Sequence, residues 1–140
     1  MPRLTAPFTI SDWTPAAPGT TPWPSDALPA LGRASFRKTY TGALDGTAAV
    51  EMLTCLADPA DMARGAVYSA LEQVTGTLDG RTGSVVFVHA ATSGDGAEGI
   101  PAGTIAPGSG TGDLAGIRGT LTIDPGSHVL TLDYTLPEGP

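Results

Sequence analysis

The chain has 140 residues, enough for one domain with its own core, and its 19 glycines and 13 prolines favour turns over long helices. Acidic residues outnumber basic ones by 14 to 7, and the net charge of -7 disfavours nucleic acid and anionic membranes as partners. The single cysteine, Cys55, excludes an intrachain disulfide and is expected to be a buried, inert thiol. Because the sequence shows no signal-peptide pattern and no membrane-length apolar stretch, we expect a soluble, cytoplasmic protein.

The first predicted strand covers Phe8 to Trp13 at the N-terminal end of the sequence. Residues 14–32 follow it, and this segment is rich in proline and glycine and has no strand pattern. A connection of this length is unusual in a small domain, so we expect either a lid or a wrap over the surface. Trp23 lies in this loop and is a candidate ligand contact. A short helical turn is expected at Pro59 to Arg64.

One six-residue pattern occurs three times along the chain. It reads TGALDG at 41–46, TGTLDG at 75–80 and TGDLAG at 111–116. Glycine permits the positive φ of a turn and Asp bonds nearby backbone, so each copy predicts a hairpin. The leucine of each copy is expected to fold back over one end of the core. The glycine-rich run at 108–112 lacks the Lys-Ser/Thr of a phosphate loop and precedes a strand, so we interpret it as a turn.

Three hairpins supply six strands, and the terminal segments Phe8–Trp13 and His128–Leu136 supply two more. Eight antiparallel strands suit a small closed barrel, which leaves no exposed sheet edge. A two-sheet sandwich is the alternative. The sequence therefore predicts an all-β protein with one domain over residues 1–140, an eight-stranded antiparallel closed barrel built from three repeated hairpins plus terminal strands.

Alternation along each strand assigns side chains to the inner or outer face of the sheet. The inward set predicted in this way is Phe36, Lys38, Tyr40, Tyr68, Glu72, Phe87, His89, Leu132 and Tyr134. Residues 49–55 leave both faces open, so Glu51 is assigned to neither side at this point.

The predicted interior contains an unusual number of polar groups. Burying them is costly unless they pair, and a Lys38–Glu72 ion pair completed by His89 and tyrosines satisfies this requirement. One interpretation is a closed structural network, and another places Lys38 at the solvated mouth of the barrel. The functional interpretation is that buried ionisable groups have shifted pKa values and act on a ligand.

Under the functional interpretation, Glu72 and His89 are candidates for proton transfer. Lys38, Tyr68 and Tyr134 are candidates to polarise or orient a carbonyl group. Further ligand contacts are expected from Phe36, Tyr40, Glu51, Phe87, Leu132, Tyr134 and Trp23. The two histidines are far apart and lack the spacing of metal ligands, so we infer no metal site and no cofactor.

Several of these elements together resemble a family of small bacterial proteins known as domain of unknown function 3224. The resemblance rests on Tyr40 to Gly46, on Glu72 with Gly76 and Leu78-Asp79-Gly80-Arg81, on Phe87 and His89, on Gly108 to Gly112, and on Tyr134. It implies a barrel like that of allene oxide cyclase, and barrels of that shape include cofactor-free cyclases.

Combining the two arguments, we expect a barrel that binds a hydrophobic or amphipathic small molecule, lipid-like or polyketide-like. A cofactor-independent cyclase or isomerase activity is the leading hypothesis. The alternatives are a non-catalytic ligand carrier or sensor, and a structural barrel whose interior is filled. Neither nucleic acid nor a membrane is an expected partner, and a homodimer is left open.

Overall fold

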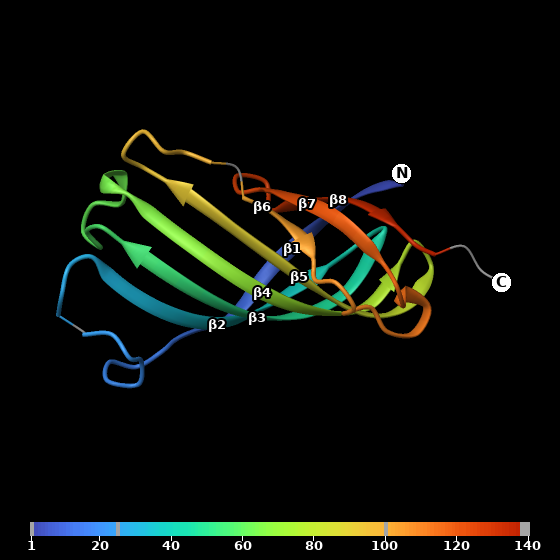
Figure 1. The fold of residues 1–140 in the computed structure, drawn as a ribbon, viewed down its shortest axis with the longest axis horizontal. Coiled ribbons are helices and arrows are strands. Elements are labelled where there is room, and N and C mark those ends of the chain that lie inside the picture. The colour runs from blue at the N-terminus through green and yellow to red at the C-terminus, as the bar shows by residue number, and fades with distance from the viewer. Residues whose placement is uncertain (1, 25, 100, 138–140) are drawn as a thin grey trace.

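The chain folds into a closed barrel of antiparallel strands in which each strand pairs with the next and β1 pairs with β8 (Figure 1). The computed structural model describes residues 2–24, 26–99 and 101–137. The strands are β1 (Arg3–Pro15), β2 (Ala30–Tyr40), β3 (Leu44–Leu56), β4 (Ala66–Leu78), β5 (Arg81–Ser93), β6 (Ala102–Ile105), β7 (Arg118–Asp124) and β8 (Val129–Thr135). The predicted all-β barrel of eight strands is therefore confirmed.

Helix is confined, over the described ranges, to two single turns of 3₁₀ type, Met62–Arg64 and Gly112–Leu114. The first lies within the helical turn predicted at Pro59 to Arg64. No helix in the described part of the chain has the length and apolarity needed to span a membrane.

The two ends of the barrel differ because the strands differ in length. Strands β2 to β5 have 11 to 13 residues each, whereas β6, β7 and β8 have 4 to 7. The long strands project past the short ones at the end where the loops after β1, β3 and β5 lie, on the left of Figure 1. We call this the open end, and the opposite end, which holds the β2–β3 and β4–β5 turns, the closed end.

The repeated pattern builds the closed end, and its leucines fill it as predicted. Leu44, Leu78 and Leu114 are at most 2% exposed. The three copies nevertheless sit differently. Leu44 follows its turn and Leu78 precedes its turn, so these two residues pair across β3 and β4. The first two copies of the pattern therefore pair with each other across β3 and β4, and the three copies are not equivalent hairpin turns.

Glycine is required where these two copies cross. A side chain at Gly76 would place its Cβ 2.1 Å from the carbonyl oxygen of Asp45, and one at Gly46 would come 2.2 Å from the carbonyl oxygen of Thr75. Both distances are far below any normal contact. The glycines of the pattern thus serve the close approach of β3 and β4 as well as the turns.

The glycine-rich run at 108–112 continues the sheet beyond the end of β6. The Thr111 hydroxyl accepts a hydrogen bond from the Ser84 backbone N–H at 3.0 Å, and the Ser109 hydroxyl accepts one from the Val86 N–H at 3.0 Å. Two hydroxyl oxygens thereby take the place of strand carbonyls along β5. These hydrogen bonds give the run a structural role along β5.

The loop between β1 and β2 is shorter than predicted and lies on the outside. The strands include Thr14, Pro15 and residues 30–32, which the sequence assigned to the loop. Trp23 lines a hollow of about 180 Å³ together with Leu31, Leu53 and Val67. These three are exposed residues of the outer sheet face, so Trp23 packs on the outside of the barrel.

Candidate functional site

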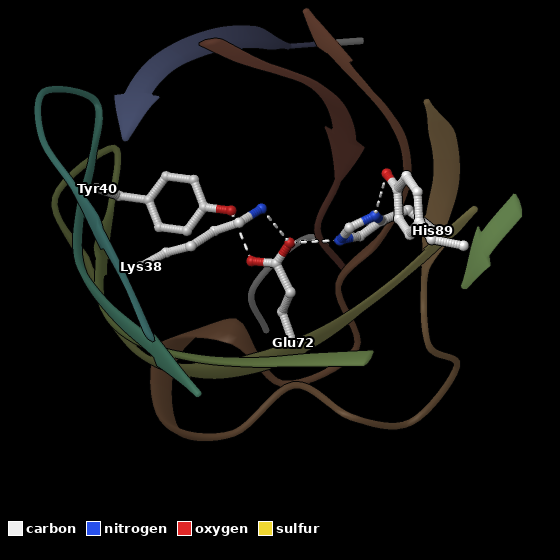
Figure 2. A network of polar contacts seen from close by, with 5 residues as sticks. Lys38, Tyr40, Glu72 and His89 are labelled. Carbon is white, nitrogen blue, oxygen red and sulfur yellow. Dashed lines mark hydrogen bonds and ion pairs between the residues drawn. The ribbon is translucent and has the colours of Figure 1, made fainter. Parts of the chain in front are cut away.

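Five polar residues from strands β2, β4 and β5 meet inside the barrel. Lys38 and Tyr40 come from β2, Tyr68 and Glu72 from β4, and His89 from β5. Each faces inward because it shares its strand face with apolar core residues, as the alternation predicted. In Figure 2 the side chains of Lys38 and Tyr40 approach the Glu72 carboxylate from one side and His89 approaches it from the other. We call these five residues the Glu72 network.

The Glu72 carboxylate is the centre of the network and uses both of its oxygens. Oε1 accepts a hydrogen bond from the Tyr40 hydroxyl at 2.7 Å. Oε2 accepts one from Lys38 Nζ at 2.7 Å and another from His89 Nε2. Nδ1 of the same imidazole lies 3.0 Å from the Tyr68 hydroxyl. The predicted Lys38–Glu72 pair is present, and Tyr40 and Tyr68 are the tyrosines that complete it.

Burial makes this pairing obligatory. Glu72 is 0% exposed, Lys38 3% and His89 4%. A charge in such surroundings is stable only if an opposite charge and hydrogen bonds replace its water. The ammonium group of Lys38 also lies over the Phe8 ring, 4.2 Å from its centroid, which adds a cation–π contact. The predicted alternative of a solvated Lys38 at the mouth of the barrel is therefore wrong.

The surroundings determine which groups carry charge. Burial by itself raises the pKa of the Glu72 carboxyl, but the hydrogen bonds and charges of His89 and Lys38 together outweigh it and hold the pKa below its ordinary value. Burial and then the facing carboxylate raise the pKa of Tyr40 far above its ordinary value. The same two causes raise the pKa of Tyr68 to about 12. At neutral pH Glu72 is an anion and both tyrosines are neutral phenols.

Tyr68 connects the network to the open end of the barrel. It is half-buried, whereas the other four members are at most 4% exposed. Apolar side chains near the open end of β1 are also only partly covered. Trp13 stacks on Phe36 with ring centroids 5.2 Å apart, yet it is 54% exposed. Ile10, which pairs with Lys38 across β1 and β2, is 43% exposed.

Trp13 is a candidate site residue that sequence reasoning missed. The sequence placed it at the end of the first strand and gave it no role in a site. Asp12 has a φ of 58°, and the β1–β2 register shifts between Ser11 and Thr14. This irregularity turns the Trp13 ring onto the inward-facing Phe36. Asp before Trp is the only local signal, since Asp tolerates positive φ better than most residues.

Several predicted ligand contacts lie elsewhere. Tyr134 is buried at the closed end, where its hydroxyl donates to Asp79 in the β4–β5 turn, so it does not join the Glu72 network. Phe87 and Leu132 do face inward, but both are 0% exposed and are part of the packed core. Strand alternation assigns these side chains to the correct face without revealing how far along the barrel they lie.

Glu51 is on the outer surface, which answers the question that the sequence left open. Val50 is 2% exposed and faces inward, and Glu51 is exposed and accepts a hydrogen bond from the Ser35 hydroxyl at 2.6 Å. Glu51 lines two outer hollows of about 710 and 530 Å³ with Leu71. Cys55, on the same face of β3, is half-buried and not in the core. Neither hollow is lined by a residue of the Glu72 network.

The polar residues do not form a metal-binding cluster anywhere in residues 2–24, 26–99 and 101–137, where no three His, Cys, Asp or Glu side chains come together. His128 lies outside the network. It sits in the β7–β8 turn with a φ of 53° and stacks on Phe8, with ring centroids 5.1 Å apart. The side chains of the Glu72 network themselves can donate, accept and transfer protons.

Comparison with known proteins identifies the family. The family model described as protein of unknown function (DUF3224) matches residues 4–134, and the chain belongs to this family. The crystal structure of a protein of unknown function from the DUF3224 family of Shewanella oneidensis MR-1 is similar, with 30% sequence identity and a TM-score of 0.78. The match covers 99% of this chain and 99% of that chain. No curated protein matches the chain.

Proposed function

We propose that this member of the DUF3224 family binds a hydrophobic or amphipathic small molecule at the open end of its barrel. There it would catalyse a non-redox isomerisation or cyclisation by moving a proton, without a cofactor. The observation that carries the proposal is the hydrogen-bonded chain from Glu72 through His89 to Tyr68. It begins at a fully buried anion and ends at a half-buried phenol toward the open end of the barrel, the end at which Trp13 and Ile10 are exposed.

The chain is suited to proton transfer because each member has a defined task. The Glu72 anion holds the His89 imidazole in one orientation and stabilises it when it becomes positively charged. Tyr68 stands between the imidazole and the open end, so it is the member able to contact a ligand. Lys38 and Tyr40 keep Glu72 charged and fixed, which makes them positioning residues.

Isomerisation is the reaction class that fits these groups. A proton leaves one atom of the substrate and returns to another, so no external oxidant, reductant or second substrate is needed. The apolar wall of Trp13, Ile10 and Phe36 would hold the hydrocarbon part of the substrate in place. The implied likeness to allene oxide cyclase barrels agrees with this proposal, although fold likeness alone does not transfer function.

A structural role is the second candidate, and one observation favours it. Within the described residues, every buried side-chain nitrogen and oxygen has a hydrogen-bond partner. A network that is complete without a ligand can serve to specify one packing of the core. In that case a ligand carrier or sensor function at the open end would not involve Glu72 or His89.

Proton exchange at a simple ketone separates the two candidates. 2-Tetralone is hydrophobic and enolisable, and in D2O its α-hydrogens are replaced by deuterium, which 1H NMR follows. We expect the wild-type protein to accelerate this exchange, and Tyr68→Phe to lose most of the acceleration, on the order of 100-fold for a general acid–base group. Tyr134→Phe is the matched control, because it removes a phenol hydroxyl at the closed end.

A folded wild-type protein without any acceleration would support the structural role instead. Equal loss in Tyr68→Phe and Tyr134→Phe would indicate a general effect on the fold. Native mass spectrometry of the purified protein adds an independent measurement, because a co-purified small molecule would show directly that the barrel binds one.

A further inference from the structure

The positions of the hydrogens in the Glu72 network specify what the open end offers to a ligand. Glu72 is an anion and can only accept hydrogen bonds. His89 Nε2 bonds to its Oε2 atom, which also accepts from Lys38. Nε2 must therefore carry a hydrogen. In a neutral imidazole that leaves Nδ1 without one, as an acceptor.

This arrangement determines which hydrogen bond the Tyr68 hydroxyl donates. This hydroxyl lies 3.0 Å from Nδ1, so the O–H group donates to the imidazole when the imidazole is neutral. Only the lone pairs of the Tyr68 oxygen are then available, so toward a ligand this oxygen can only accept a hydrogen bond. A ligand that meets this oxygen must bring a hydrogen of its own, and a carbonyl or ether oxygen meets it without a hydrogen bond.

The charge balance of the network excludes a second kind of ligand. The Lys38 ammonium is paired with the Glu72 carboxylate at 2.7 Å, and the two charges cancel. The tyrosines are neutral, and so is His89 in the state that accepts from Tyr68. The network therefore presents no uncompensated positive charge to the open end that would attract a carboxylate or a phosphate.

We infer that the molecule bound at Tyr68 is uncharged and carries an enol or phenol hydroxyl, which donates its hydrogen to the Tyr68 oxygen while its hydrocarbon part lies against Trp13, Ile10 and Phe36. This inference rests on the proposed function and names its substrate class.

The same contact defines the direction of proton transfer. The ligand O–H bond breaks and its proton joins the Tyr68 oxygen, as the Tyr68 proton moves to His89 Nδ1. Tyr68 ends unchanged, the imidazole becomes an imidazolium that faces the Glu72 anion, and the ligand keeps the electron pair as an enolate. Tyr68 then gives a proton to the enolate carbon and takes one back from His89 Nδ1, which yields the ketone and a neutral imidazole, so the atoms and the charge balance over the reaction.

The first test reads the imidazole directly and needs no ligand. The chain has two histidines, and His128→Asn removes the second one while retaining a residue that tolerates its positive φ. In the 15N-labelled variant at neutral pH, NMR should show His89 with hydrogen on Nε2 and none on Nδ1. Hydrogen on Nδ1 would overturn the inference, because Tyr68 would then be free to donate to a carbonyl.

The second test uses two compounds that differ only at the oxygen. 2-Naphthol is a stable mimic of the 2-tetralone enol, and 2-methoxynaphthalene lacks its donor hydrogen. By calorimetry at neutral pH, wild type should bind 2-naphthol at least about tenfold more tightly, which equals about 1.4 kcal/mol. In Tyr68→Phe the ratio should fall to about one while the affinity for 2-methoxynaphthalene stays the same. Tyr134→Phe should keep the wild-type ratio.

The outcomes separate the inference from the proposed function. A ratio near one in wild type, a ratio that survives Tyr68→Phe, or no binding of either compound overturns the inference. If the ratio is near one but 2-tetralone still exchanges through Tyr68, the inference alone fails. If the ratio is as expected and no exchange occurs, the hydroxyl site stands and the catalytic proposal fails.

Discussion

Replacing Glu72 by Gln tests whether its negative charge holds the Glu72 network together. The substitution preserves shape, and the amide oxygen still accepts a hydrogen bond, but the Lys38 ammonium is left 3% exposed without a counter-charge. Removing one partner of a buried ion pair costs about 3–5 kcal/mol, against a total stability of about 5–15 kcal/mol for a domain. At about 3 °C per kcal/mol, Glu72→Gln should lower Tm by roughly 10–15 °C.

The assay is urea unfolding of wild type, Glu72→Gln, Lys38→Met and the double variant, in a double-mutant cycle. Met keeps most of the length of the lysine stem and removes the charge. We expect the double variant to be more stable than Glu72→Gln alone, with a coupling energy of about 2 kcal/mol or more. A loss below about 1 kcal/mol in Glu72→Gln, or additive single effects, would refute the reasoning, since it would mean that water or another group compensates the buried charge.

The same cycle predicts a pH dependence. Because the pKa of Glu72 is lower in the folded protein than its ordinary value of 4.5, the carboxylate contributes stability that is fully present above that value. This contribution is lost as the pH falls from about 4.5 through the folded pKa. The difference in unfolding free energy between wild type and Glu72→Gln should therefore be constant from neutral pH down to about pH 5 and shrink below it. A difference that grows on acidification would contradict the direction of the shift.

Three predictions concern the closed end, each measured by urea unfolding. Leu78→Ala empties a site that is 0% exposed and should cost about 2–5 kcal/mol, whereas a cost below 1 kcal/mol would mean that the end is not packed. Gly76→Ala should prevent folding or lower the free energy of unfolding by more than about 3 kcal/mol, because its Cβ meets a backbone oxygen. Gly80→Ala is the control: its Cβ would have no atom within 4 Å, and the positive φ alone should lower the free energy of unfolding by only about 1 kcal/mol. Thr111→Val leaves the Ser84 N–H without its acceptor and should cost about 1–3 kcal/mol, and a neutral effect would show that water replaces the hydroxyl.

Strand alternation was sufficient to identify most of the Glu72 network. Lys38 and Glu72 each share a strand face with aromatic or apolar residues, so a period of two assigns them to the interior without any knowledge of the fold. The need to pair buried charges then predicts that Lys38 and Glu72 meet. The repeated pattern likewise indicates three hairpins and a leucine plug, because glycine and leucine are placed in it by backbone geometry and by burial.

Strand alternation does not indicate where along the barrel axis a side chain lies. Tyr134 and Tyr40 are both inward-facing tyrosines, and only the pairing register of the strands decides that Tyr40 bonds to Glu72 whereas Tyr134 bonds to Asp79 in the β4–β5 turn. The outer position of Trp23 depends on how the loop packs, for which the sequence has no periodic signal.

The sequence by itself determined that this protein is an antiparallel barrel with charged groups turned into its interior, since a strand's faces follow from local spacing. Only the tertiary structure decided that the charged groups form one complete network around Glu72, and that Tyr68 is the member of this network that reaches toward the open end. The physical reason is that hydrogen bonds depend on register and strand length. Both are properties of neighbouring strands together, which no single strand encodes.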